Sequence, residues 1–150
     1  GETLDGGNGN DTLFGSAGAD DLLGSAGDDV IAAGAGDDNL NGDGVLDTSV
    51  PGGDDWLDGG AGADKLWGDG GSDVLYGGAG NDELVGDSGN GAAISDHGDD
   101  MLDGEDGDDK LWGEGGSDVI LTSHLTDCYR SVCLTNNRNF AENTEWRMAA

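Results

Sequence analysis

Basic residues, proline, cysteine and long hydrophobic runs are all scarce in this chain of 150 residues. Only five Lys and Arg stand against 33 Asp and Glu, so the formal net charge is −28 at pH 7. Such a chain repels nucleic acid phosphates and anionic membrane surfaces, which excludes both as partners. Two cysteines are too few for a disulfide scaffold, and no apolar run approaches the roughly 18 residues of a membrane-spanning helix. Because a globule with this charge would repel itself strongly, the chain either stays disordered or folds around bound cations.

Glycine and acidic residues are confined to the first part of the chain. All 32 glycines and all but three of the acids precede Thr122, whereas residues 122–150 carry no net charge. The composition therefore predicts an acidic, glycine-rich body over residues 1–121 and a C-terminal tail or cap over residues 122–150.

The body repeats every nine residues, in eleven copies that begin with G-G-N-G-N-D-T-L-F at Gly6. Position eight of every copy is Leu or Ile. Position four is always glycine: Gly9, Gly18, Gly27, Gly36, Gly53, Gly62, Gly71, Gly80, Gly98, Gly107 and Gly116. Position six is always aspartate: Asp11, Asp20, Asp29, Asp38, Asp55, Asp64, Asp73, Asp82, Asp100, Asp109 and Asp118. Three invariant columns define a repeat architecture rather than a biased composition.

Two stretches interrupt the repeat. Residues 42–49 are one residue short of a copy, and residues 86–94 keep the length but lose the aspartate. Residues 53–75 and 98–120 also align with each other at an offset of 45, which is five nonapeptides. Duplication of a five-repeat unit explains both the long-range match and the two irregular loops.

The nine-residue spacing predicts an all-β solenoid. The residues around position eight form a minimal strand with its middle side chain pointing inward, and the glycine-rich stretch before it forms a turn. Two copies make one coil, so equivalent turns stack 18 residues apart and contact only their neighbours. Positions seven and nine then face outward and hold the aromatic residues Phe14, Trp56, Trp67, Tyr76 and Trp112.

Stacked turns align the aspartates into a column of like charge that requires cations. Calcium fits, because it takes six to eight oxygen ligands from carboxylates and backbone carbonyls, whereas zinc prefers Cys or His. The turns that stack within the unbroken blocks begin at residues 6 and 24, 15 and 33, 50 and 68, 59 and 77, and 95 and 113. These pairs predict five calcium sites, and up to eleven if each irregular stretch occupies half a coil.

The columns resemble the nonapeptide G-G-x-G-x-D-x-U-x of RTX (haemolysin-type) calcium-binding proteins. The resemblance covers residues 6–121 apart from the two irregular stretches. It implies a right-handed parallel β-roll, with calcium held between successive turns by the position-six aspartates and by backbone carbonyls near the position-four glycines. It also implies a protein of a Gram-negative bacterium, exported by type I secretion to the extracellular space or the cell surface.

Catalysis finds no support, since no H-E-x-x-H, G-x-S-x-G or phosphate-loop motif is present. Acid pairs such as Asp28-Asp29 recur with the repeat, which favours calcium ligation or charge balance over acid–base chemistry. The leading interpretation is a module that folds on binding calcium within a secreted bacterial protein. Two alternatives stay open: a unit of an adhesin, surface layer or fibre that self-associates end to end, and a glycan-binding accessory of an extracellular enzyme. Exposed tryptophans beside acids can serve as a sugar platform, or they can pack the outer surface.

Overall fold

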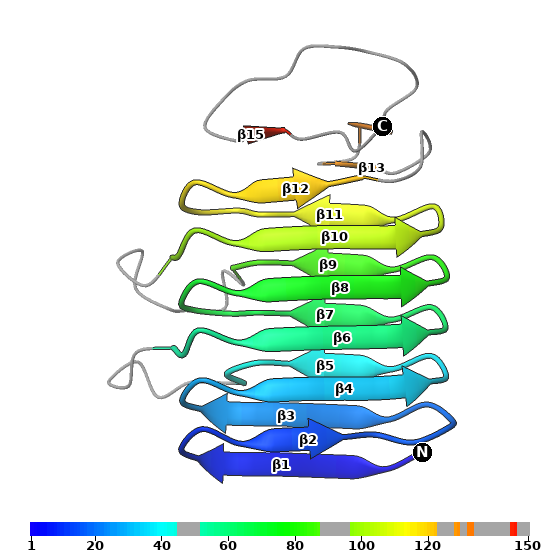
Figure 1. Cartoon of the computed structure of the whole chain (residues 1–150), viewed down its shortest axis with the longest axis vertical. Coiled ribbons are helices and arrows are strands. Elements are labelled where there is room, and N and C mark those ends of the chain that lie inside the picture. The colour runs from blue at the N-terminus through cyan, green and yellow to red at the C-terminus, as the bar shows by residue number, and fades with distance from the viewer. Residues whose placement is uncertain (45–51, 88–96, 123–127, 130–131, 134–144, 147–150) are drawn as a thin grey trace.

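The chain forms two stacked parallel β-sheets in a computed structural model (Figure 1). The structure describes residues 1–44, 52–87 and 97–122, and the backbone of three short strands beyond them. The first sheet has the order β1(Thr3–Asn8), β3(Asp21–Ala26), β5(Asn39–Asn41), β7(Lys65–Trp67), β9(Glu83–Val85), β11(Lys110–Trp112), β13(Cys128–Tyr129) and β14(Val132–Cys133). The second has the order β2(Thr12–Phe14), β4(Val30–Ala35), β6(Trp56–Ala61), β8(Val74–Ala79), β10(Met101–Asp106), β12(Val119–Leu121) and β15(Glu145–Trp146). Because successive strands alternate between the sheets, the fold is the expected parallel β-roll. None of the described residues forms a helix that could cross a membrane.

Strand register confirms that equivalent repeat positions stack on one another. Leu22 pairs with Leu4 on one side and with Leu40 on the other, at the 18-residue spacing predicted for one coil. The inward residues of position eight form the core: Leu13, Leu22, Ile31, Leu40, Leu57, Leu66, Leu75, Leu84, Leu102, Leu111 and Ile120, together with Ala33. Each of these side chains is at most 6% exposed. The core is thin, since it receives about one aliphatic side chain from every nine residues.

The irregular stretches do not occupy half a coil, so that option in the sequence-based site count is wrong. Leu40 pairs with Leu66, 26 residues later, and Leu84 pairs with Leu111, 27 residues later. These offsets are one coil plus an inserted segment of eight or nine residues. Alternation between the sheets therefore continues across each insertion, and turns that flank it stack directly.

Each insertion leaves the roll from inside a turn. Gly42 lies against Asp55, and Gly86 lies against Asp100, as Gly59 lies against Asp64 in an uninterrupted turn. Gly42-Asp43 and Gly86-Asp87 therefore occupy positions one and two of these turns. We therefore place the starts of the insertions two residues later than the expected residues 42 and 86. Both interrupted turns lie on the same side of the roll, because both lead into strands of the second sheet, β6 and β10.

The tail continues both sheets at the C-terminal end of the roll. β13 pairs with β11 in parallel, and β15 pairs with β12 in parallel. The last coil of the repeat body thus has backbone partners from residues beyond Thr122.

Candidate metal centres

Two columns of buried aspartates run along the roll, one at each side. The insertion edge comprises the turns that lead into the second sheet and carries Asp11, Asp29, Asp55, Asp73, Asp100 and Asp118. The plain edge comprises the turns that lead into the first sheet and carries Asp20, Asp38, Asp64, Asp82 and Asp109. Apart from Asp11, which is half-buried, these side chains are at most 5% exposed. Buried carboxylates at this density require compensation by positive charge or by protons.

One carboxylate oxygen of each column member after Asp11 accepts a backbone N–H from the preceding coil. Oδ1 of Asp82 accepts the backbone N–H of Asp64 at 2.8 Å, and Oδ1 of Asp73 accepts that of Asp55 at 2.9 Å. The same bond occurs at every step, five times on the insertion edge and four times on the plain edge. These bonds fix the orientation of each carboxylate and leave Oδ2 pointing into the turn.

The second oxygen has no protein hydrogen-bond partner in most of the columns. In the described part of the chain, this holds for the buried Oδ2 atoms of Asp11, Asp29, Asp38, Asp55, Asp64, Asp73, Asp82 and Asp100. An unsatisfied buried oxygen costs free energy, and its repetition at equivalent places in successive coils indicates a missing partner of one kind.

Glycine at position one leaves room beside that oxygen. A β-carbon built on Gly59 would lie 2.7 Å from Oδ2 of Asp64 and 2.7 Å from the carbonyl oxygen of Gly77, which is position one of the next coil. Gly77 repeats the arrangement, at 2.6 Å from Asp82 Oδ2 and 2.9 Å from the Gly104 carbonyl oxygen. Each turn thus brings a carboxylate and the carbonyl of the following coil to one point that a side chain would fill.

The sequence-based prediction assigned the carbonyl ligands to the neighbourhood of position four and did not single out these position-one carbonyls. The structure gives the position-four glycines a packing reason for their invariance. A β-carbon on Gly27 would lie 2.8 Å from the backbone of Gly9 in the preceding coil, and the later glycines of this column, from Gly36 to Gly116, are at least as close to the coil before them. Gly9 and Gly18, in the first coil, lack that contact but adopt a positive φ of 109° and 119°. The position-four carbonyls remain candidates, while those of position one lie beside Oδ2.

Burial dominates the electrostatics of the columns. It raises the pKa of Asp73 to about 9, against the hydrogen bond from Asp55, with the neighbouring Asp100 and Asp55 carboxylates adding to the rise. Burial likewise raises the pKa of Asp55 and of Asp100 to about 8. On the plain edge, burial raises the pKa of Asp64 only to about 6. The central aspartates of the insertion edge, Asp55, Asp73 and Asp100, are therefore strongly desolvated and gain much from neutralisation by a cation.

A second ladder, at position five, joins the coils outside the metal columns. Asp28 Oδ1 accepts the N–H of Asp54, Asp54 Oδ1 accepts that of Ser72, and Asp99 Oδ1 accepts that of Ser117. Asp28, in an acid pair that the sequence associated with calcium or charge balance, is thus a hydrogen-bonding residue. The predominance of Asp, Asn and Ser at position five is the signal that could have revealed this ladder.

Two further buried aspartates close the interrupted turns. Asp43 accepts the N–H of Gly53 through Oδ1 at 3.0 Å and that of Gly70 in the next coil through Oδ2 at 3.1 Å. Asp87 accepts the N–H of Gly115, the counterpart of Gly70, at 3.1 Å. Both carboxylates are at most 2% exposed. They hold together the residues where each inserted segment leaves and re-enters the roll.

The donor set fits a hard divalent cation. Oxygen alone is offered, from carboxylates and backbone carbonyls, as calcium prefers. No three His, Cys, Asp or Glu side chains converge on a single point among the described residues, so carbonyls must supply much of the coordination. The fold and these columns define a β-roll repeat protein whose stacked turns offer oxygen ligands to cations.

Comparison with known families names that class. The sequence profile of the RTX calcium-binding nonapeptide repeat, which spans four copies, matches residues 1–31, 14–48, 52–84, 59–93 and 94–122. The chain belongs to this family, as the resemblance of its columns implied, and its repeats form a structural calcium-binding module. No curated protein matches the chain.

Proposed function

We propose that this chain is a calcium-driven folding module in which one ion binds in each interval between stacked turns. The observation that supports this most directly is the repeated, buried, unpartnered Oδ2 beside the position-one carbonyl of the following coil. A calcium ion would coordinate the aspartate Oδ2 and the position-one carbonyl oxygen together, and its charge would neutralise the carboxylates of the column. Binding free energy then becomes folding free energy, since the site does not exist in the unfolded chain.

The topology supports nine such intervals. Six stacked turns enclose five intervals on the insertion edge, and five turns enclose four on the plain edge, each marked by an Asp-to-Asp hydrogen bond. The position-six aspartates are the proposed side-chain ligands, through Oδ2. Asp43 is not a proposed ligand, because both of its carboxylate oxygens already accept backbone N–H groups. Asp87 accepts a backbone N–H through Oδ2 and keeps a buried Oδ1 without a protein partner, so it stays a candidate ligand at the second interrupted turn.

A calcium titration followed by circular dichroism tests the proposal. In chelator near neutral pH the chain should show little β signal, and it should gain that signal cooperatively at about 0.1–1 mM calcium, the range of extracellular calcium modules. Magnesium at the same concentration should not replace calcium, because it demands octahedral geometry and keeps its waters. Full β signal in chelator at pH 7 would contradict the proposal.

RTX repeats are typical of proteins that Gram-negative bacteria secrete, and we place this chain in that setting. Extracellular calcium is plentiful there, so a chain that stays unfolded without calcium would fold after export. Calcium dependence of folding is the property that such a module contributes to its protein.

End-to-end association is a second candidate function, favoured by one observation. β1 and β2 are the terminal strands of their sheets, each paired on a single side among the described residues. Such edges accept a further strand readily. Light scattering of the calcium-loaded chain over a range of protein concentrations tests this candidate, and a monomer at every concentration would exclude it.

A further inference from the structure

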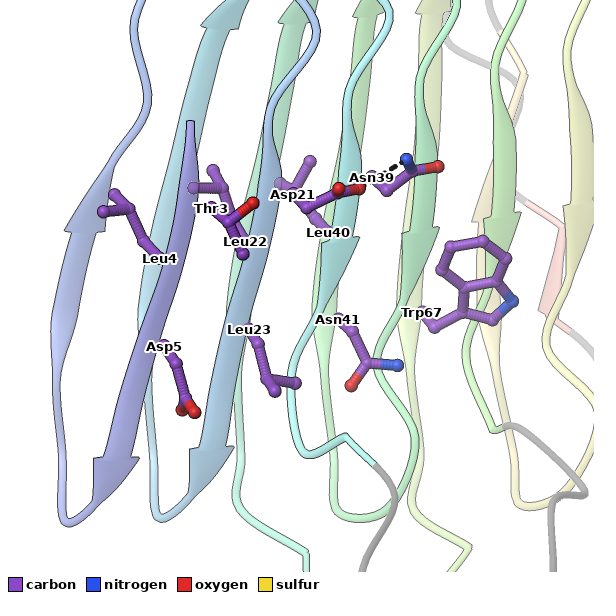
Figure 2. A pocket seen from close by; sticks show the side chains of 10 residues that line it. All are labelled: Thr3, Leu4, Asp5, Asp21, Leu22, Leu23, Asn39, Leu40, Asn41 and Trp67. Atoms are coloured by element: carbon purple, nitrogen blue, oxygen red, sulfur yellow. Dashed lines mark hydrogen bonds between the residues drawn. The ribbon is translucent and has the colours of Figure 1, made fainter. Parts of the chain in front are cut away.

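Away from the metal columns, a groove crosses the outer face of the first sheet (Figure 2). It runs over β1, β3 and β5 and ends at Trp67 on β7. Asp21 and Asn39 border it in the position-seven row, and Leu23 and Asn41 border it in the position-nine row. Its volume is about 350 Å³, which is near the lower end of the roughly 300–1,000 Å³ typical of ligand sites.

The polar groups of this Trp67 groove are held in place by hydrogen bonds. Asn39 Nδ2 donates to Asp21 Oδ1 at 2.8 Å, and the Ser25 hydroxyl donates to Asp5 Oδ1 at 2.8 Å. Asp5, Asp21 and Asn39 are nonetheless exposed. No described residue bonds to Oδ2 of either aspartate or to Oδ1 of Asn39. Acceptor atoms therefore stand along the rim of the groove, whose own lining is largely apolar.

Its apolar surface comes from Trp67 and Leu23, which are both half-buried. Figure 2 shows the indole ring of Trp67 nearly face-on at the end of the two rows. An aromatic ring supplies a large rigid contact surface at little entropic cost. Aromatic surface beside fixed acceptors is suited to a molecule with apolar faces and hydroxyl edges.

Charge narrows the ligand class further. Two carboxylates in the groove and a chain charge of −28 disfavour anions. Lys65 lies on β7 with Trp67 and pairs in register with Asn39 on β5. Its exposed ammonium group places one positive charge and a hydrogen-bond donor near the Trp67 end of the groove. The acceptors repeat with the strand spacing of about 4.8 Å, which is comparable with the length of one pyranose residue.

We propose that the Trp67 groove binds an uncharged oligosaccharide that lies across the strands, with one pyranose stacked on Trp67. Hydroxyl groups of the next sugars donate to Asn39, Asp21 and Asp5. The site depends on the folded roll, since β5 and β7 are joined across the first insertion. This inference needs that roll but not a particular number of bound ions.

The test uses the full chain in saturating calcium, with its β signal verified by circular dichroism so that a folding failure is seen separately. The probes are cellotetraose, mannotetraose, xylotetraose and chitotetraose as neutral sugars, with tetragalacturonate as an anion and the chitosan tetramer as a cation. Tryptophan fluorescence and chemical shifts of the indole N–H groups report binding. Trp67→Ala is the test variant. Trp112→Ala is the matched control, because Trp112 occupies the same place in the duplicated K-L-W segment 45 residues later and does not line the groove.

At least one neutral tetrasaccharide should bind, and Trp67→Ala should weaken that binding about tenfold or more, as expected for a central aromatic contact. Trp112→Ala should leave it unchanged, and the two charged probes should bind more weakly than the best neutral sugar. The proposal is overturned if no neutral tetrasaccharide binds at about 10 mM, if both tryptophan variants lose binding equally, or if a charged probe binds best.

Discussion

Replacing Asp73 with asparagine separates the two roles that each column aspartate combines. Asparagine retains an oxygen that can accept the Asp55 N–H, now bonded at 2.9 Å. It replaces Oδ2, which faces the Gly86 carbonyl beside Gly68, with an amide nitrogen that cannot bind calcium. Burial already raises the pKa of Asp73 to about 9, so a neutral side chain suits the cation-free roll. We therefore expect Asp73→Asn to lose bound calcium without weakening the cation-free state.

The size of the effect follows from linkage. When free calcium is 100 times the dissociation constant, each lost ion lowers the free energy of unfolding by about 2.7 kcal/mol. For nine equal sites, with free calcium at the folding midpoint about ten times the dissociation constant, losing one site raises the midpoint about 1.4-fold and losing two raises it about twofold. The substitution should thus cost one or two ions and shift the midpoint by 1.4-fold to twofold by this estimate.

Calorimetry gives the stoichiometry, and a calcium titration followed by circular dichroism gives the midpoint. Asp58→Asn is the matched control, because the substitution removes the same charge and Asp58 lies at position nine on β6, away from the columns. The control should retain every ion. If both variants changed the stoichiometry and the midpoint equally, bulk charge rather than ligation would govern binding, and the ligand assignment would fail.

Four other predictions test separate parts of the structure. In chelator, β signal should rise as pH falls from about 9 to 5, because burial lifts the pKa values of Asp55, Asp73 and Asp100 above the ordinary 3.8 and the roll then binds more protons than the unfolded chain. Saturating calcium should remove this dependence, and a signal that falls on acidification would contradict it. Gly59→Ala should lose an ion and lower the free energy of unfolding by about 1–3 kcal/mol, because the added β-carbon meets Asp64 Oδ2 and the backbone carbonyl of Gly77. Unchanged ion stoichiometry in calorimetry would count against a metal site at this point. Asp43→Ala should lower the thermal midpoint in saturating calcium, because it leaves two buried N–H groups unpaired at a cost of about 1–3 kcal/mol each. Calorimetry should still show the full number of bound ions, and a lost ion would make Asp43 a ligand. Deleting residues 122–150 should increase light scattering in calcium, because the pairing of β13 and β15 with the last coil supports a capping role for the tail. A monodisperse monomer would refute that role.

Much of this protein was determined by the sequence alone. The aliphatic residue at position eight predicted the core, and every one of the eleven side chains is buried there. The invariant aspartate predicted columns at the two sides of a roll, and the turns of the unbroken blocks stack in the pairs expected. These features could be predicted because each coil contacts only its neighbours, so a local period dictates the long-range pairing.

Only the tertiary structure decided what the irregular stretches do. Their lengths of eight and nine residues are so near one repeat that spacing cannot distinguish half a coil from an insertion. Hydrogen bonds between coils make the difference, because skipping the segment keeps Leu40 against Leu66 and lets Asp43 bind Gly53 and Gly70. The same pairing brings Trp67 beside Asn41, 26 residues earlier, and so creates a groove that no local pattern contains.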